Sequence, residues 1–293
     1  MMKFSLMLAA EPPEQLVTLA KAAEEAGFDG VSIADSICYP KEEESKYLYN
    51  ADGSRDFLDG QPFIDPLLLA AHLSAVTSKL TFTTAVYKLP VRQPVIVAKQ
   101  LASLAVLSNN RFKFGVGISP WSQDFAAAGV PWEKRGKRLN ECIEIIRGLL
   151  SGEYFSFDSE MYQIPEIKLC PVPSQAVPIL IGGHAEVALK RAARLGDGWI
   201  AAGGTADDFS PIIDRINVLR KEYGRDQLPF EVQANGVDTF SLDGLKKLTD
   251  IGVHSSYVGF YNLYEGKPDT RTLDEKIGQI QWYGSELIGK YRA

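Results

Sequence analysis

The sequence predicts one α/β domain over residues 1–293, built as a closed (β/α)8 TIM barrel. Eight short apolar runs alternate with eight helical patterns along the chain. The length of 293 residues suits one such barrel. The first apolar run ends in Leu8-Ala9-Ala10-Glu11 and lacks the GxGxxG turn of an open dinucleotide-binding sheet.

The strands are expected where β-branched and aromatic residues cluster between turn residues. The third, LTFTTAV, is the most β-branched, and the fourth reads RFKFGVG. The eight predicted strands cover 3–8, 30–34, 80–86, 111–117, 177–181, 198–202, 230–234 and 254–260.

The helices are expected where apolar residues recur at helical spacing between start and stop signals. Gly27 ends the first, and Asp65 followed by Pro66 is a typical N-cap and first helical position. The predicted helices cover 12–26, 65–76, 94–107, 133–150, 185–195, 207–223, 243–251 and 273–291.

Two insertions interrupt the alternation. Residues 36–62, after the second strand, carry Tyr39, Tyr47, Tyr49 and Phe57, which is aromatic for a loop. Loops of this length are usually functional, so a substrate lid and a subunit-contact arm are both open interpretations. Around 152–178, a stretch rich in Tyr, Phe and Pro predicts a small hairpin.

Composition excludes several classes of protein. The chain has 31 Lys and Arg against 37 Asp and Glu, a net charge of −6, which argues against nucleic acid as the main partner. No apolar stretch reaches the ~18 residues of a membrane span. The apolar start ends at Glu11 and fits a buried strand better than a secretory signal. Cys38, Cys142 and Cys170 form no CxxC pair, so we expect a reducing, cytoplasmic setting.

In a barrel of this kind, active sites form at the carboxyl ends of the strands. The residues predicted there are rich in glycine, hydroxyl and aromatic side chains and poor in Asp, Glu and His. They are Asp35-Ser36, Thr84-Ala85-Val86-Tyr87, Gly117-Ile118-Ser119-Pro120-Trp121, Gly182-Gly183-His184, Gly203-Gly204-Thr205, Asn235-Gly236 and Tyr261-Asn262.

This composition disfavours three kinds of site. A metal centre needs three or four convergent ligands, and the chain has only three histidines. A glycosidase needs two carboxylates, and Asp35 is the only one at a confidently placed strand end. The stretch Gly117–Trp121 does not match the GxSxG of a serine nucleophile. A pocket for a planar cofactor that supplies its own reactivity remains.

Two local features have two interpretations each. Gly182-Gly183-His184 precedes a helix and suits a phosphate near free N–H groups, or it is only a tight turn. Trp121 either stacks on a ring or covers the top of the barrel.

Several stretches, which follow one another in the same order as in the family, resemble the bacterial-luciferase-like superfamily. They most closely resemble its coenzyme F420 (deazaflavin)-dependent oxidoreductases. The resemblance runs over most of residues 1–205. Its stretches are TSKLTFTT with LPVRQP and AKQLA, LSNNRF, GVG, GVPWE, RGKR, PILIGG and AARLGDGW.

The resemblance implies a TIM barrel, usually a homodimer, that holds a deazaflavin or FMN at the strand ends. It places a non-proline cis peptide at Thr84-Ala85 and the cofactor phosphate at Gly182-Gly183-His184. The implied cofactor-binding residues are Asp35, Ser36, Thr84, Ala85, Gly117, Ile118, Ser119, Gly182, Gly183 and His184. Tyr39, Tyr87 and Trp121 would border a small-molecule substrate, and no metal is implied.

The chain departs from the pattern in two places, so no catalytic residue is assigned. Many relatives carry Asp-His after the second strand, whereas this chain has Asp35-Ser36, and serine is no base near pH 7. An acidic residue that some relatives carry after the strand-four glycines is replaced by Pro120. A proton would come from water, Tyr39, Tyr87 or the substrate.

The resulting expectation is hydride transfer between coenzyme F420 and an organic substrate. An FMNH2- and O2-dependent monooxygenase is the second hypothesis. A non-catalytic flavin-binding protein is the third.

Overall fold

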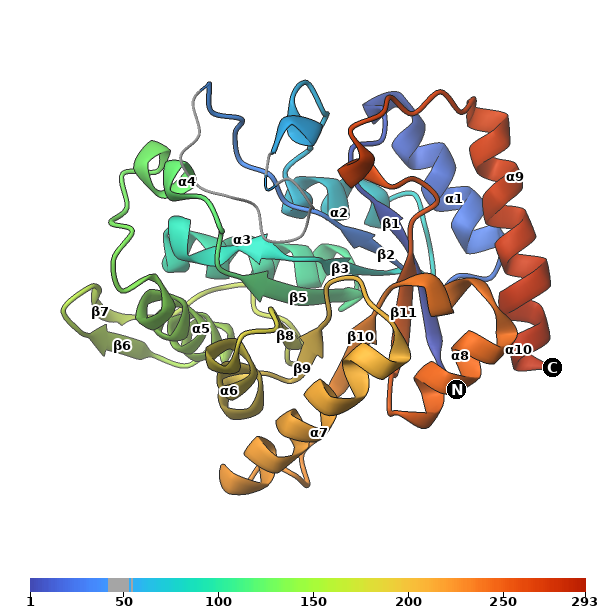
Figure 1. The fold of residues 1–293 in the computed structure, drawn as a ribbon. Coiled ribbons are helices and arrows are strands. Elements are labelled where there is room, and N and C mark those ends of the chain that lie inside the picture. Colours follow the sequence, from blue (N-terminus) through green and yellow to red (C-terminus); the bar gives the residue numbers. More distant parts are fainter. Residues whose placement is uncertain (42–52, 54) are drawn as a thin grey trace.

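The computed structural model describes residues 1–41, 53 and 55–293, and within them the predicted closed barrel is confirmed (Figure 1). Eight parallel strands form the ring. They are β1 (Lys3–Leu8), β2 (Gly30–Ile33), β3 (Thr81–Thr84), β5 (Phe112–Gly117), β8 (Ile179–Gly182), β9 (Gly198–Ile200), β10 (Glu231–Ala234) and β11 (Ser255–Val258).

The ring closes because each strand of the described set has two parallel neighbours. β1 pairs with β2 and β11, and β3 pairs with β5 at Phe82↔Phe112. The short β4 (Tyr87–Lys88) also pairs with β5, further along, so it continues the line of β3.

The third strand differs from its prediction, because it is split into β3 and β4 by a non-proline cis peptide. The cis bond joins Ala85 and Val86, so the expected position at Thr84-Ala85 was wrong by one residue. The amide of Ala85 still donates to the carbonyl of Ile33 at 2.8 Å, so the pairing with β2 continues through Ala85. The chain leaves the sheet only after that residue.

The barrel is surrounded by helices at the predicted positions (Figure 1). Asp65 is the expected N-cap, with its carboxylate accepting from the amides of Leu67 and Leu68. The short α4, between β5 and α5, was not predicted. The helices are α1 (Leu16–Glu25), α2 (Pro66–Ser74), α3 (Pro94–Leu107), α4 (Ser122–Ala127), α5 (Arg135–Leu150), α6 (Glu186–Leu195), α7 (Ala206–Glu222), α8 (Leu242–Asp250), α9 (Leu273–Tyr283) and α10 (Lys290–Arg292).

The closing helix is not continuous as predicted. Residues Gly284–Gly289 form a π-helical segment between α9 and α10. A Cβ at Gly284 would lie 2.3 Å from the carbonyl oxygen of Ala26, so the helix passes very close to the end of α1. Glycine permits this approach because it has no side chain.

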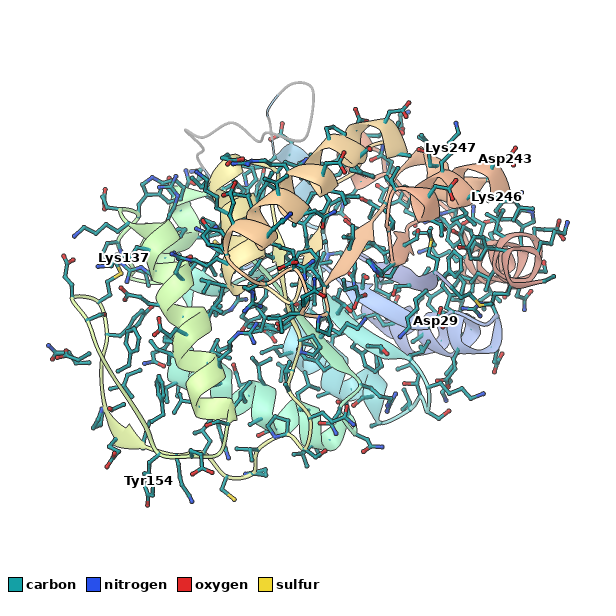
Figure 2. All side chains as sticks on the ribbon, turned by 90° about the horizontal axis from the view of Figure 1, so that it is seen from below. Asp29, Lys137, Tyr154, Asp243, Lys246 and Lys247 are labelled. Carbon is teal, nitrogen blue, oxygen red and sulfur yellow. The ribbon has the colours of Figure 1, made fainter. Side chains whose placement is uncertain are left out.

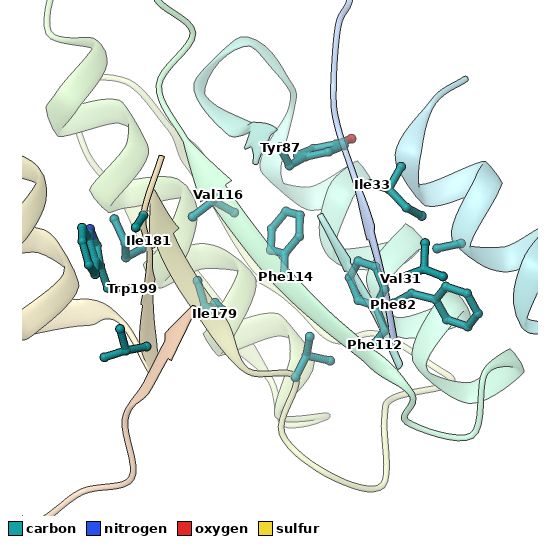
Figure 3. Packing of buried hydrophobic residues seen from close by; sticks show 14 of the residues in the cluster. Val31, Ile33, Phe82, Tyr87, Phe112, Phe114, Val116, Ile179, Ile181 and Trp199 are labelled. Atoms are coloured by element: carbon teal, nitrogen blue, oxygen red, sulfur yellow. The ribbon is translucent and has the colours of Figure 1, made fainter. Parts of the chain in front are cut away.

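The core lies between the strands and the helices. Alternate strand residues such as Val31, Phe82, Phe114 and Ile181 are fully buried there, and Figure 3 shows them packed together along β2, β3, β5 and β8. A smaller cluster of Leu180, Ile200 and Tyr257 is separate from this core. Successive side chains of a strand point to opposite faces, so the strand residues that alternate with the outer core residues face the inside of the ring.

The described residues of the two insertions lie outside the ring. The predicted hairpin is confirmed as β6 (Phe155–Asp158) and β7 (Gln163–Ile167), an antiparallel pair beside α5 (Figure 1). In the insertion after β2, Tyr47 and Tyr49 fall outside the described residues.

Figure 2 shows charged side chains such as Lys137 and Lys246 at the periphery of the molecule. In the described part of the chain, no helix is long and apolar enough to cross a membrane.

Candidate functional site

A cavity of about 730 Å³ opens at the carboxyl ends of the strands. Every strand of the ring ends at it, because residues that follow β1, β2, β3, β5, β8, β9, β10 and β11 contribute to its wall. Eight of the thirteen predicted site residues line it, namely Asp35, Ser36, Ala85, Gly117, Ile118, Trp121, Gly182 and Gly183.

The other five predicted residues lie behind or beside the wall. Thr84 is buried and its hydroxyl donates to the carbonyl of Gly115 at 2.7 Å. Ser119 is buried and donates to Asp124 at 2.5 Å. Tyr39 is exposed, and its hydroxyl is 3.4 Å from Asp56. These three side chains thus reach protein partners and not the cavity.

Tyr87, proposed from the sequence as a proton source, is fully buried. The guanidinium of Arg92 lies over its ring at 3.8 Å, and burial raises the pKa of its hydroxyl. Its ring packs on Phe114 in the outer core. This position favours a structural role for Tyr87.

His184, the fifth of these residues, stands beside the wall as a neutral imidazole. Its Nε2 accepts from the amide of Ala202 at 3.0 Å, and its ring packs on Trp199 at 5.4 Å. Burial lowers its pKa, because a charged ring loses solvation there. His184 therefore braces the turns after β8 and β9.

The wall at the end of β3 is formed by Ala85 and Val86. A Cβ at Gly117 would lie 2.6 Å from Val86 Cγ2, and one at Gly182 would lie 2.7 Å from Val86 Cγ1. Val86 thus sits in a space that two glycines on neighbouring strands leave open. The result is an apolar bulge in the cavity wall.

Asp35 lines the cavity with its charge already paired. Its carboxylate accepts two hydrogen bonds from Arg92, at 2.6 and 2.9 Å, and one from the amide of Lys88 at 2.8 Å. The Asp35 side chain is only 1% exposed. It anchors β4 and the turn before α3 to the end of β2.

Sequence reasoning missed the ion pair between Lys88 and Asp124. Lys88 lines the cavity, and its Nζ is 2.8 Å from Asp124 Oδ2, with the two side chains 9% and 0% exposed. Asp124 also accepts from Ser119 and lies 3.5 Å from the thiol of Cys38. The amide of Trp121 donates to the Ser119 hydroxyl at 3.1 Å, so this network supports the indole in the wall.

Asn235 was expected at a strand end, but it was not among the predicted cofactor-binding residues. It lines the cavity after β10, and its Oδ1 is buried with no hydrogen-bond partner among the described residues. A buried carbonyl oxygen without a partner is uncommon and fits a ligand that donates a hydrogen bond. In the sequence, its position at the carboxyl end of a predicted strand was the feature that indicated a place in the site.

The turn between β8 and α6 allows a ligand to approach the backbone closely. Gly183 has φ of +116°, a conformation that favours glycine. Ala185 is the N-cap of α6 and has no side-chain oxygen to accept from the first amides of the helix. Thr205 and Thr272 cap α7 and α9 with side-chain oxygens. The start of α6 therefore leaves amide donors for another acceptor.

Aromatic residues from two distant segments complete the cavity wall. Phe57 belongs to the insertion after β2, and Tyr264 follows β11; their ring centres are 5.1 Å apart.

No group of three or more His, Cys, Asp or Glu residues that could hold a metal ion occurs among the described residues.

The sequence model of the luciferase-like monooxygenase family matches residues 2–237. The chain belongs to this family. An uncharacterised protein of Mycobacterium tuberculosis is 48% identical over 289 residues, covering 99% of this chain and 100% of the relative.

The name of a second relative states an enzyme activity. The F420-dependent hydroxymycolic acid dehydrogenase of Mycobacterium tuberculosis is 31% identical over 199 residues, 67% of this chain and 51% of that protein. Among solved structures, a monooxygenase from Streptomyces bottropensis has the same fold, with a TM-score of 0.80 and 14% identity over 99% of this chain and 100% of that one. The protein is therefore a luciferase-like oxidoreductase.

Proposed function

We propose that the protein transfers a hydride between coenzyme F420 and an organic substrate. The observation that carries this proposal is the shape of the barrel mouth: the apolar bulge of Ala85 and Val86 lies in the cavity wall beside Gly117 and Gly182, which carry no side chains. Such a wall suits one face of a flat ring. The F420-dependent relative supports the deazaflavin over FMN.

The residues present fit a phosphorylated cofactor. The start of α6 offers amide donors and the positive end of a helix dipole, and Gly183 lets the backbone approach the phosphate closely. The orphaned Oδ1 of Asn235 would accept a hydrogen bond from the ring or its polyol chain. Ser36, Gly117 and Ile118 would lie along the ring.

A bound reduced deazaflavin supplies the hydride; the chain supplies position and exclusion of water. Asp35 and Asp124 are each paired with a cation, Arg92 and Lys88 respectively, so we assign proton transfer to neither carboxylate. Tyr87 does not reach the cavity. Of the proton sources expected from the sequence, Tyr39 also lies outside the cavity lining, so water and the substrate remain.

A flavin-dependent monooxygenase remains the second candidate, favoured by the whole-chain similarity to the Streptomyces bottropensis monooxygenase. A protein that binds the ring without turnover is the third. The expected homodimer stays a prediction that sedimentation would test.

The test is equilibrium titration of the purified protein with coenzyme F420 and, separately, with FMN, followed by ligand fluorescence. The proposal expects F420 to bind at least ten times more tightly, which is about 1.4 kcal/mol. Tight FMN binding with no F420 binding would select the monooxygenase. Binding of neither ring would overturn the cofactor assignment altogether.

A further inference from the structure

The described part of the cavity wall carries almost no free charge. Among the described residues that line it, Asp35 and Lys88 are the two whose side chains are charged at neutral pH. Arg92 holds Asp35 through two hydrogen bonds, and Asp124 holds Lys88 at 2.8 Å. Each lining charge is therefore paired with an opposite charge that does not line the cavity.

A charged substrate would gain little from such a wall. Moving a carboxylate or phosphate out of water costs several kcal/mol unless a new partner compensates. Lys88 could compensate only by giving up Asp124, which is fully buried and would then be left without its cation. The described wall thus disfavours anionic substrates.

Another part of the cavity wall is aromatic. Tyr261 and Tyr264 follow β11, Phe240 follows β10, and Phe57 comes from the insertion after β2. Phe57 and Tyr264 meet edge to face, with ring planes at 67°. Aromatic side chains bury a large apolar area and favour ring partners in stacked or edge-to-face geometry.

The segment that carries Tyr261 and Tyr264 is fixed at its far end by buried ion pairs. Lys276 of α9 is 2.6 Å from Glu11 and 3.2 Å from Asp269. Arg271 binds the same Asp269 through two hydrogen bonds at 2.8 Å. This network ties the segment after β11 to α9 and to the turn after β1, so the aromatic wall is held in place before any ligand arrives.

We propose that the substrate is an uncharged molecule with a flat, apolar body, bound between the cofactor ring and the aromatic wall of Phe57 and Tyr264. This inference rests on the proposed function, since it assigns the Val86 side of the cavity to the cofactor. It makes Phe57 and Tyr264 specificity-determining residues. It excludes sugar phosphates and carboxylates as preferred substrates.

The test compares two probes that differ only in charge, 2-acetonaphthone and 6-acetyl-2-naphthoate. Calorimetry measures their binding to the protein loaded with whichever of F420 and FMN binds. The inference expects the uncharged ketone to bind at least ten times more tightly. Equal or tighter binding of the carboxylate, with the cofactor bound, would overturn this inference alone. Failure of both cofactors to bind would overturn the proposed function and with it this inference.

Two variants test the aromatic wall. Tyr264→Ala should weaken the ketone at least fivefold and leave cofactor affinity unchanged, and Tyr264→Phe should restore ketone binding because the ring remains. Tyr154→Ala is the matched control, since this exposed tyrosine lies at the periphery of the molecule (Figure 2). Unchanged ketone binding by Tyr264→Ala would contradict the assignment of the wall.

A third variant tests whether the ion pair of Lys88 causes the preference for an uncharged ligand. Asp124→Asn keeps the shape and an acceptor for Ser119 but removes the charge that cancels Lys88. The folded variant, checked by its melting temperature, should bind the naphthoate at least tenfold more tightly than the parent protein does. No gain by a folded variant would contradict the role given to this ion pair. If the variant does not fold, the ketone-to-naphthoate ratio of the parent protein decides.

Discussion

Val86 fills the space that a side chain at Gly117 would need. A Cβ there would lie 2.6 Å from Val86 Cγ2, well inside van der Waals contact. Valine is stiff at χ1, and Gly182 is also close to Val86, so the side chain has little room to turn away. The bulge on the cavity wall thus depends on a glycine from a neighbouring strand.

Gly117→Ala should push Val86 into the cavity and weaken cofactor binding. Overpacking of this kind costs ~1–3 kcal/mol, so we expect about a tenfold loss of affinity in fluorescence titration. Gly278→Ala is the control, because a Cβ there meets nothing within 4 Å. Cofactor affinity equal to that of the parent protein would show that the Val86 bulge does not form the binding wall.

Ala185→Asp should stabilise the free protein and weaken a phosphorylated cofactor. An aspartate at the N-cap of α6 adds about 1 kcal/mol of stability, because it accepts from the free amides. The same carboxylate repels a phosphate, so affinity for FMN or F420 should fall more than tenfold. Riboflavin, which lacks the phosphate, should bind as before. An equal loss for riboflavin would argue against a phosphate site here.

Asn235→Ala should leave folding unchanged and reduce cofactor affinity. The buried Oδ1 has no partner among the described residues, so its removal breaks no described hydrogen bond. One hydrogen bond to the ligand is worth about 1 kcal/mol, or about fivefold in affinity. Denaturant unfolding and cofactor titration of the same variant check the two halves. A large loss of stability with no loss of affinity would make Asn235 structural.

Lys88→Met should destabilise the protein by ~3–5 kcal/mol, because it leaves the buried Asp124 carboxylate without its cation. The double variant with Asp124→Leu should regain much of that free energy of unfolding, since no buried charge then remains. Lys246→Met is the control, because its pair with Asp243 is exposed and 3.8 Å long (Figure 2). Additive effects in the double variant would disprove the coupling.

His184 should make stability depend on pH. Burial lowers its pKa in the folded protein, so below the unfolded pKa, ~6.5, the unfolded chain binds more protons. Stability is therefore full above that pH and falls as the pH drops toward the folded pKa. In His184→Gln this loss between pH 7.5 and pH 5.5 should be smaller, as measured by urea unfolding. An identical slope in the variant would rule out His184 as its source.

Local sequence patterns were sufficient to predict the barrel. The alternation of apolar runs and helical stripes, with turn residues such as Gly27 and caps such as Asp65, set the order of the elements. Barrel topology then placed the strand ends on one rim, so eight of the predicted site residues line the cavity. These features depend on neighbours in the chain, and a sequence displays such neighbours directly.

Tertiary structure alone decided what each side chain at the rim does. Asp35 is held by Arg92 and Lys88 by Asp124, partners 57 and 36 residues away along the chain. The aromatic wall joins Phe57 to Tyr264 from distant segments, and the amide of Ala85 pairs with Ile33 from another strand. Whether a charge is free or cancelled depends on contacts between remote segments, and those contacts exist only after the ring has closed.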